Sequence, residues 1–372
     1  MIKAPSTEPI EKNPGTKPRS FLRALLSGLV VFVLFAGLLE GVYRLGWADN
    51  MLPMRSVGNY HTQFEIKWFK LEEYVRQNGG VDVILLGNSM VNTGIDPEVL
   101  SAKYAELTGQ QVRVFNFGVE GLTIEPLSIL ARILEEKYHP ATIIIFTEMR
   151  DYITGNGDQV SADFLGNAWV QQQFGHPSLE GYLESNSSAL QHLLPFRYWY
   201  NSDFLDTYLL NTRRLAETTA SGYEAARGTE IDVNQEPDPT DPKEAVIFDL
   251  FKNYSMDEQR ITALESILAY EEDGTQIIVT EMPVFFTYYS YLEKESDRED
   301  YLARLQEIAL AHGGTYLEMI SWQPIHNSGF ADNHHLNYMG AETYTNLFAA
   351  QLADLCSTQQ VCLASSMDEV QP

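Results

Sequence analysis

Three side chains in this sequence could together carry out acyl transfer: Ser89, Asp332 and His335. Ser89 follows an apolar run directly after a glycine and an asparagine, where a strand would turn into a helix. A serine hydroxyl becomes a good nucleophile only when a base takes its proton. Asp332 precedes His335 by three residues, so its carboxylate can reach the imidazole Nδ1 and stabilise the imidazolium. The pattern predicts a Ser–His–Asp triad, although Ser89 taken alone would be interpreted as a turn residue.

Acyl transfer also requires hydrogen-bond donors at the oxyanion of the tetrahedral intermediate. The backbone N–H of Ser89 is one candidate if this residue opens a helix. Gly118 and Gly121 follow the second predicted strand, and a glycine there lets the backbone approach a substrate closely. Arg150 follows the third predicted strand, at the same edge of a parallel sheet.

The elements that must position these groups alternate along the chain. Apolar runs predict strands at residues 81–86, 111–115, 142–146, 276–280 and 315–317. Helical periodicity predicts helices at 61–77, 96–107, 125–137, 256–272, 297–311 and 338–353. Strands rich in Val, Ile and Leu that alternate with helices indicate a parallel sheet covered on both faces. Parallel strands end at one edge of their sheet, so Ser89 can meet the Asp332–His335 pair there.

The N-terminal region contains a second strong signal. Residues 24–39 carry no charge, and with the residues up to 43 they are long enough to cross a bilayer. Five basic residues precede this run, which favours a cytoplasmic N-terminus: Lys3, Lys12, Lys17, Arg19 and Arg23. We expect a disordered cytoplasmic tail at 1–20, a single transmembrane helix at 21–44 in the cytoplasmic membrane, and an extracytoplasmic remainder. A cleaved signal peptide is the competing interpretation, but no clean small-x-small cleavage site follows the run.

The remainder divides into a linker with a leading helix at 45–79, an α/β domain at 80–355 and a C-terminal tail at 356–372. The domain contains an insertion at 151–252 that is rich in aromatic residues, has weak periodicity and ends in a polar, proline-bearing loop. Such insertions usually lie over the carboxyl edge of the sheet, where ligands bind. Its aromatic residues are interpreted as core or lid packing rather than a sugar platform. Cys356 and Cys362 can form a disulfide in an oxidising compartment or remain free thiols.

The residues and their order resemble the SGNH/GDSL hydrolase superfamily. That family has Gly-Asp-Ser after the first strand, then Asn…Gly, Gly-x-Asn-Asp and Asp-x-x-His blocks. The matching stretches in this sequence are Gly87-Asn88-Ser89, Asn116…Gly121, Glu148-Met149-Arg150-Asp151 and Asp332-Asn333-His334-His335. The resemblance covers residues 80–150 and 256–355 and omits the insertion. It implies a three-layer α/β/α, flavodoxin-like parallel sheet, with Ser89 as nucleophile, His335 as base and Asp332 as the group that orients the base.

The same resemblance implies that the amides of Ser89 and Gly121 donate to the oxyanion. The third donor of the family is an asparagine side chain, and Arg150 stands at that position. Arginine can donate, but it is charged and reaches further. We expect His335 rather than His334 to be the base, because it is in register with the family block. Glu148 is expected to pair with Arg150 rather than to act as a second acid.

A single span followed by an outward-facing domain looks like the alginate O-acetyltransferase-like and related cell-envelope branches of the family. This likeness implies an acylated or acyl-accepting glycan as substrate and a multi-span membrane-bound O-acyltransferase as partner. Transfer and hydrolysis share an acyl-enzyme on Ser89, and the motifs do not separate the two reactions. The alternative is a weakly active or inactive scaffold that docks the acyltransferase or the glycan.

Composition excludes several other classes of function. The formal net charge is −26, which argues against nucleic-acid binding because phosphate contacts need clustered Lys and Arg. The sequence contains no dinucleotide fingerprint, no P-loop and no zinc-ligand spacing. No cofactor or metal is therefore expected.

Overall fold

The computed structural model describes residues 18–46, 51–59, 61–226, 236–359 and 361–363. One parallel sheet has the strand order β2-β1-β3-β4-β5. Its strands are β1 Val83–Gly87, β2 Val114–Gly118, β3 Thr142–Thr147, β4 Gln276–Glu281 and β5 Thr315–Tyr316. This order is that of flavodoxin-like folds, in which ligands bind at the carboxyl edge near the β1/β3 switch point. The predicted α/β class and all five predicted strands are confirmed.

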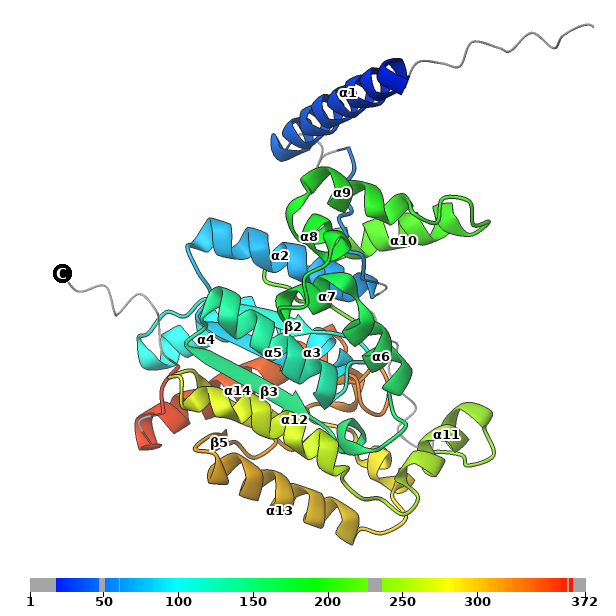
Figure 1. Ribbon diagram of the computed structural model, residues 1–372. Helices are drawn as coiled ribbons and strands as arrows, with labels where there is room; N and C mark the ends of the chain where they lie inside the picture. The colour runs from blue at the N-terminus through cyan, green and yellow to red at the C-terminus, as the bar shows by residue number, and fades with distance from the viewer. Residues whose placement is uncertain (1–17, 47–50, 60, 227–235, 360, 364–372) are drawn as a thin grey trace, which may run out of the picture.

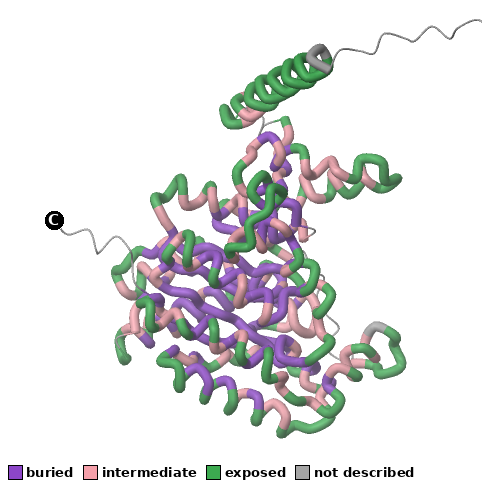
Figure 2. The backbone as a smooth tube through the Cα atoms, in the orientation of Figure 1, coloured by how far each residue is buried: buried purple, intermediate pink, exposed green. Residues whose placement is uncertain are grey.

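Helices cover both faces of the sheet and create three layers (Figure 1). On one face, α4 (Pro97–Thr108) packs against α14 (Tyr338–Gln359). On the other, α5 (Ile124–Tyr138) packs against α12 (Glu258–Leu268), and α13 (Ser296–Ala311) lies against β5. Figure 2 shows that the buried residues concentrate along the sheet. Strands β1, β2 and β3 are buried along their whole length, as expected for a sheet covered on both faces.

Several predicted boundaries differ from the structure by a few residues, and two of the differences have a clear physical reason. The second strand begins at Val114 rather than at residue 111, because the carbonyl of Arg113 accepts from the N–H groups of Asp82 and Val83 and sets the register with β1. The C-terminal tail does not begin at 356, since α14 continues to Gln359. A disulfide joins Cys356 to Cys362, and Leu363 is buried with its N–H donated to Tyr104. The disulfide and this contact tie the chain to the domain beyond the predicted helix end.

The insertion is helical, although its sequence shows little periodicity. Its elements are α6 (Asp158–Gly166), α7 (Ala168–Gln173), α8 (Leu179–Asn186), α9 (Ser188–Leu193), η3 (Leu194–Phe196), α10 (Phe204–Glu217) and α11 (Pro242–Phe251). Most are too short to repeat an apolar face, and side chains cap three of them: Asn167, Ser178 and Ser187. The predicted leading helix is present as α2 (Thr62–Asn78), whose Phe64 ring contacts Phe117 of β2 and Trp169 of α7.

The segment predicted to cross the membrane forms the helix α1 (Pro18–Arg44), of which Phe21–Arg44 is long and apolar enough to cross a membrane. By length and composition, this helix could be a membrane span or a signal sequence. Its residues 21–38 are exposed, whereas Leu39, Glu40, Val42 and Tyr43 near its end are partly buried (Figure 2). Helix α1 includes residues 18–20, which the sequence assigns to the tail, and residues 1–17 of that tail lie outside the described part of the chain.

Candidate active site

Ser89 lies at the carboxyl edge of the sheet because β1 runs directly into the short helix α3 (Ser89–Gly94). The Asn88 side chain caps this helix by accepting from the N–H of Met90 at 2.9 Å. Helix α3 passes very close to the end of β2, where a Cβ on Gly118 would be 2.3 Å from the Asn92 nitrogen. The glycine at 118 therefore permits the approach of α3 that sets the position of Ser89.

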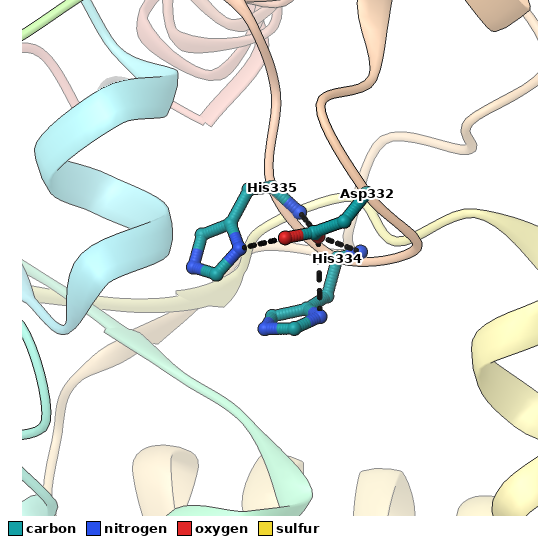
Figure 3. Close-up of side chains that lie close together, drawn as sticks. All are labelled: Asp332, His334 and His335. Atoms are coloured by element: carbon teal, nitrogen blue, oxygen red, sulfur yellow. Dashed lines mark hydrogen bonds and ion pairs between the residues drawn. The ribbon is translucent and has the colours of Figure 1, made fainter. Parts of the chain in front are cut away.

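His335 and Asp332 complete a chain of hydrogen bonds to Ser89. The Nε2 atom of His335 is 2.8 Å from the Ser89 Oγ, and its Nδ1 atom is 2.7 Å from the Asp332 Oδ2. The other carboxylate oxygen of Asp332 accepts from the backbone N–H of His335 at 2.7 Å. Figure 3 shows the carboxylate held against the His335 ring. The structure thus brings together the three residues that the sequence singles out, from opposite ends of the domain.

The charge state of Asp332 fixes the tautomer of His335. Burial opposes ionisation of Asp332, but the hydrogen bond with His335 and the two neighbouring imidazoles outweigh it and lower the pKa of the carboxyl. An ionised carboxylate can only accept, so Nδ1 of His335 carries the hydrogen in the neutral ring. The free lone pair of Nε2 then faces the Ser89 hydroxyl and can accept its proton.

His334 occupies a different environment from its neighbour. Its ring centroid is 4.0 Å from that of His335, and its Nδ1 lies 2.7 Å from the Asn333 Oδ1. Burial, together with the charge of Arg150, lowers the pKa of His334 to about 3. The ligand atoms of Asp332, His334 and His335 lie close enough together to hold a metal ion. Hydrogen bonds between Asp332 and the His335 ring and between Asn333 and the His334 ring already explain why these atoms are close.

The low pKa of His334 makes stability depend on pH. Between about 3 and the ordinary value of 6.5, the unfolded chain binds the proton more readily than the folded chain, so acidification favours unfolding. Lowering the pH from 7 to 5 should remove about 2 kcal/mol of the free energy of unfolding through this residue. Denaturant unfolding of the wild type and of His334→Ala at both pH values measures this loss. An equal loss in the variant would show that His334 is not its source.

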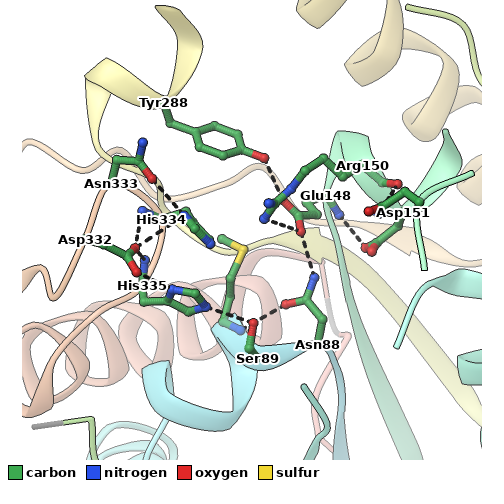
Figure 4. Close-up of polar contacts among 12 residues, drawn as sticks. Asn88, Ser89, Glu148, Arg150, Asp151, Tyr288, Asp332, Asn333, His334 and His335 are labelled. Carbon is green, nitrogen blue, oxygen red and sulfur yellow. Dashed lines mark hydrogen bonds and ion pairs between the residues drawn. The ribbon is translucent and has the colours of Figure 1, made fainter. Parts of the chain in front are cut away.

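A buried ion pair lies beside the triad, where the sequence departs from the family pattern (Figure 4). Arg150 donates from Nε and Nη2 to the two carboxylate oxygens of Glu148, at 3.0 and 2.9 Å. The same carboxylate accepts from Asn88 at 3.0 Å and from the hydroxyl of Tyr288 in η5 (Phe286–Tyr291) at 2.8 Å. Burial opposes ionisation of Glu148, but the Arg150 charge outweighs it and lowers the pKa of the carboxyl. Glu148 is therefore a partner of Arg150, as expected, and it also steadies the asparagine that caps α3.

Removal of the Glu148 carboxylate should destabilise the domain strongly. Glu148→Ala leaves the Arg150 charge buried without its partner, which typically costs about 3–5 kcal/mol. Glu136→Ala is a matched control, since Glu136 also pairs with an arginine but at the exposed surface, and its loss should cost less than about 1 kcal/mol. Denaturant unfolding compares the two variants. Similar values for both would mean that the buried pair contributes no more than a surface pair.

A cleft of about 370 Å³ adjoins the triad, and the insertion forms part of its wall. Ser89 and His335 lie on one side, with Glu120, Arg214 and Glu224 facing the same space. Arg214 at the end of α10 bridges Glu120 and Glu224, with a distance of 2.8 Å to each carboxylate. Sequence reasoning missed Arg214 and Glu224, since no motif marks them and the insertion has weak periodicity.

The two other predicted oxyanion groups lie at the same edge of the sheet. Gly121 is exposed in the turn after β2, directly beside the cleft residue Glu120, with a left-handed φ of 73° that favours glycine. Arg150 lies in η2 (Met149–Tyr152), after β3. Two of its guanidinium nitrogens already donate to Glu148. The roles of both residues as oxyanion donors remain predictions.

Comparisons with known proteins identify similar folds only at low identity. No family model matches the sequence, and no curated protein matches it. The chain is similar to a lipase/acylhydrolase from Enterococcus faecalis, with 13% identity, a TM-score of 0.36, and coverage of 75% of this chain and 96% of that one. A GDSL-like lipase from Bacteroides thetaiotaomicron shows 12% identity, a TM-score of 0.31, and coverage of 76% and 97%. These values do not assign an activity, so the assignment depends on the residues around Ser89.

Proposed function

We propose that this chain is a serine-dependent enzyme of ester chemistry, of the SGNH type, that forms an acyl-enzyme on Ser89. One observation carries the proposal: the unbroken contacts from Ser89 Oγ through His335 to Asp332, at 2.8 and 2.7 Å. A hydroxyl held against the free imidazole nitrogen, with a carboxylate on the other nitrogen, is the arrangement that activates serine for attack on a carbonyl.

The proposed reaction has two steps. Ser89 Oγ attacks the ester carbonyl while its proton passes to Nε2 of His335, and the backbone N–H groups of Ser89 and Gly121 stabilise the oxyanion. Collapse of the intermediate breaks the bond to the alcohol, which leaves with the proton from His335. A water molecule or a hydroxyl of an acceptor then attacks the acyl-Ser89 ester, with His335 again taking and returning the proton. Water gives hydrolysis, and an acceptor hydroxyl gives O-acyl transfer.

We further propose that the enzyme is anchored in the cytoplasmic membrane by α1 and faces outward. Basic residues precede the apolar run, which favours a cytoplasmic N-terminus. A disulfide between Cys356 and Cys362 is typical of proteins in oxidising compartments. The substrate at this location would be an exported or cell-envelope glycan, with a multi-span membrane-bound O-acyltransferase as partner in the transfer reaction.

A scaffold without turnover is the second candidate, and the ion pair in the third block is the observation that favours it. Glu148 holds two of the Arg150 donors in a buried pair, which leaves fewer donors of Arg150 for the oxyanion at the position where the family has an asparagine. Such a scaffold would bind the acyltransferase or the glycan through the same fold.

A serine-reactive fluorophosphonate probe separates the two candidates. The enzyme should be labelled in its purified, detergent-solubilised full-length form, because the probe reports an activated serine without knowledge of the acyl group. Absence of labelling under all conditions tested would favour the scaffold. Mass spectrometry of the labelled protein should locate the adduct on Ser89, and an adduct elsewhere would contradict the assignment.

A further inference from the structure

The last turns of α1 dock onto the insertion through specific polar contacts. The Glu40 carboxylate lies at the start of α9 and accepts from the Ser187 hydroxyl at 2.8 Å and from the Ser188 and Ala189 N–H groups at 3.0 and 3.2 Å. Arg44 donates to the carbonyl of Asn186 at 2.9 Å. A carboxylate at a helix N-terminus satisfies backbone donors that otherwise lack partners. The outer end of α1 and the junction of α8 with α9 are therefore neighbours, and Figure 1 shows α9 beside the end of α1.

Next to this junction, the insertion exposes large apolar and aromatic side chains. They lie in the turn before α10 and on the outward side of that helix, and we call them the insertion surface: Trp199, Tyr200, Leu205, Leu209 and Leu210. Each of the five is more than half exposed. Large exposed apolar side chains that gather in one region of a protein surface normally mark an interaction site.

Helix α10 has one half-buried face and one exposed face with apolar residues, as a helix that lies at an interface would have. Phe204 and Tyr208 are half-buried, and both rings contact Phe196 of η3. Leu205 and Leu209 are one turn apart on the exposed side. Amphipathic helices with Leu and Trp on one face lie in the plane of a membrane surface, and Trp and Tyr are enriched at that depth.

We propose that the insertion surface lies in the headgroup region of the same bilayer that α1 crosses. This inference rests on the proposed membrane anchor. The docking of α1 onto α9 places the insertion surface beside the end of the span, so the occupant favoured by position is the lipid interface. The net charge of −26 gives no general attraction to anionic lipid, so apolar burial drives the contact and zwitterionic lipid suffices.

The contact of the insertion surface with lipid would also fix the position of the active-site cleft relative to the bilayer. The exposed leucines lie in the first half of α10, while Arg214 near its end lines the cleft beside Ser89. From Leu209 to Arg214, α10 extends over five residues, about 8 Å along its axis. Because a helix at the interface runs along the membrane surface, its cleft end is held beside the bilayer, within reach of an acyl group or acceptor presented at the membrane surface.

Single-cysteine labelling in lipid nanodiscs tests the proposal with the full-length protein. Both native cysteines are bridged, so an introduced cysteine can be labelled selectively with a maleimide-linked NBD dye. The test variant is Leu209→Cys, and the control is Leu310→Cys on α13, at the opposite end of the molecule from α1 (Figure 1). The two leucines are 57% and 58% exposed. Trp199→Cys provides a second test position on the insertion surface.

Phosphatidylcholine carrying a doxyl quencher near the headgroup should quench the dye at 209 and 199 several-fold more strongly than the dye at 310. Equal, weak quenching at all three sites would overturn the proposal and leave the insertion surface to a protein partner. A dye at Val31→Cys, in the middle of α1, tests the anchor separately with acyl-chain doxyl lipid. Quenching at 31 without quenching at 209 and 199 would refute this inference alone. No quenching at 31 would refute the membrane anchor and this inference with it.

Discussion

Replacing Ser89 by alanine is expected to lower the turnover of an ester substrate by about 10⁴-fold or more, because the acyl-enzyme can no longer form. The fold should change little. Ser89 is only partly buried, and the loss of its hydrogen bond to His335 costs about 1 kcal/mol. Release of p-nitrophenol from p-nitrophenyl acetate, measured for wild type and variant side by side, gives the ratio. Fluorophosphonate labelling should be lost in parallel.

Ser128→Ala serves as the control for the serine substitution. The Ser128 hydroxyl is also partly buried, but it donates to a backbone carbonyl within α5, away from the cleft. This variant should keep both turnover and labelling. Turnover of Ser89→Ala within tenfold of the wild type would mean that another residue supplies the nucleophile, whatever the distances at the site.

The second large effect is expected at His335. His335→Ala removes the group that takes the proton from Ser89, and turnover should fall by several orders of magnitude, as for other members of catalytic triads. His334→Ala offers a closely matched comparison, because the two imidazoles are adjacent in sequence and in contact. Within the described residues, only the His335 ring is hydrogen-bonded to the Ser89 hydroxyl, so the change at 334 should be far smaller.

Steady-state kinetics of the two variants with the same ester decides between the histidines. The full-length proteins should first be matched for folding by circular dichroism, since loss of the buried His334 ring also removes packing. Equal losses of turnover would contradict the assignment of His335 as the only base. A larger loss of turnover in His334→Ala than in His335→Ala would identify His334 as the base.

Local sequence patterns determined the architecture and most of the site. Strands such as β3 are buried on both faces, so their apolar runs mark them without knowledge of their neighbours. Parallel strands end at one edge, and this rule alone places Ser89 and the loop of Asp332 and His335 at the same edge of the sheet. The three-residue offset between Asp332 and His335 is likewise local, because a single turn of chain brings the carboxylate to the ring.

The tertiary structure alone decided which polar groups neutralise one another and how the insertion is placed. The pairing of Arg150 with Glu148 has a local component, but its burial and the added bonds from Asn88 and Tyr288 depend on elements far apart in sequence. The same holds for Arg214, which lines the cleft where it pairs with Glu120 after β2 and with Glu224 beyond α10. Short helices such as α8 and α9 carry too few turns to show a period, so contacts like that of Glu40 with α9 exist only once the chain has folded.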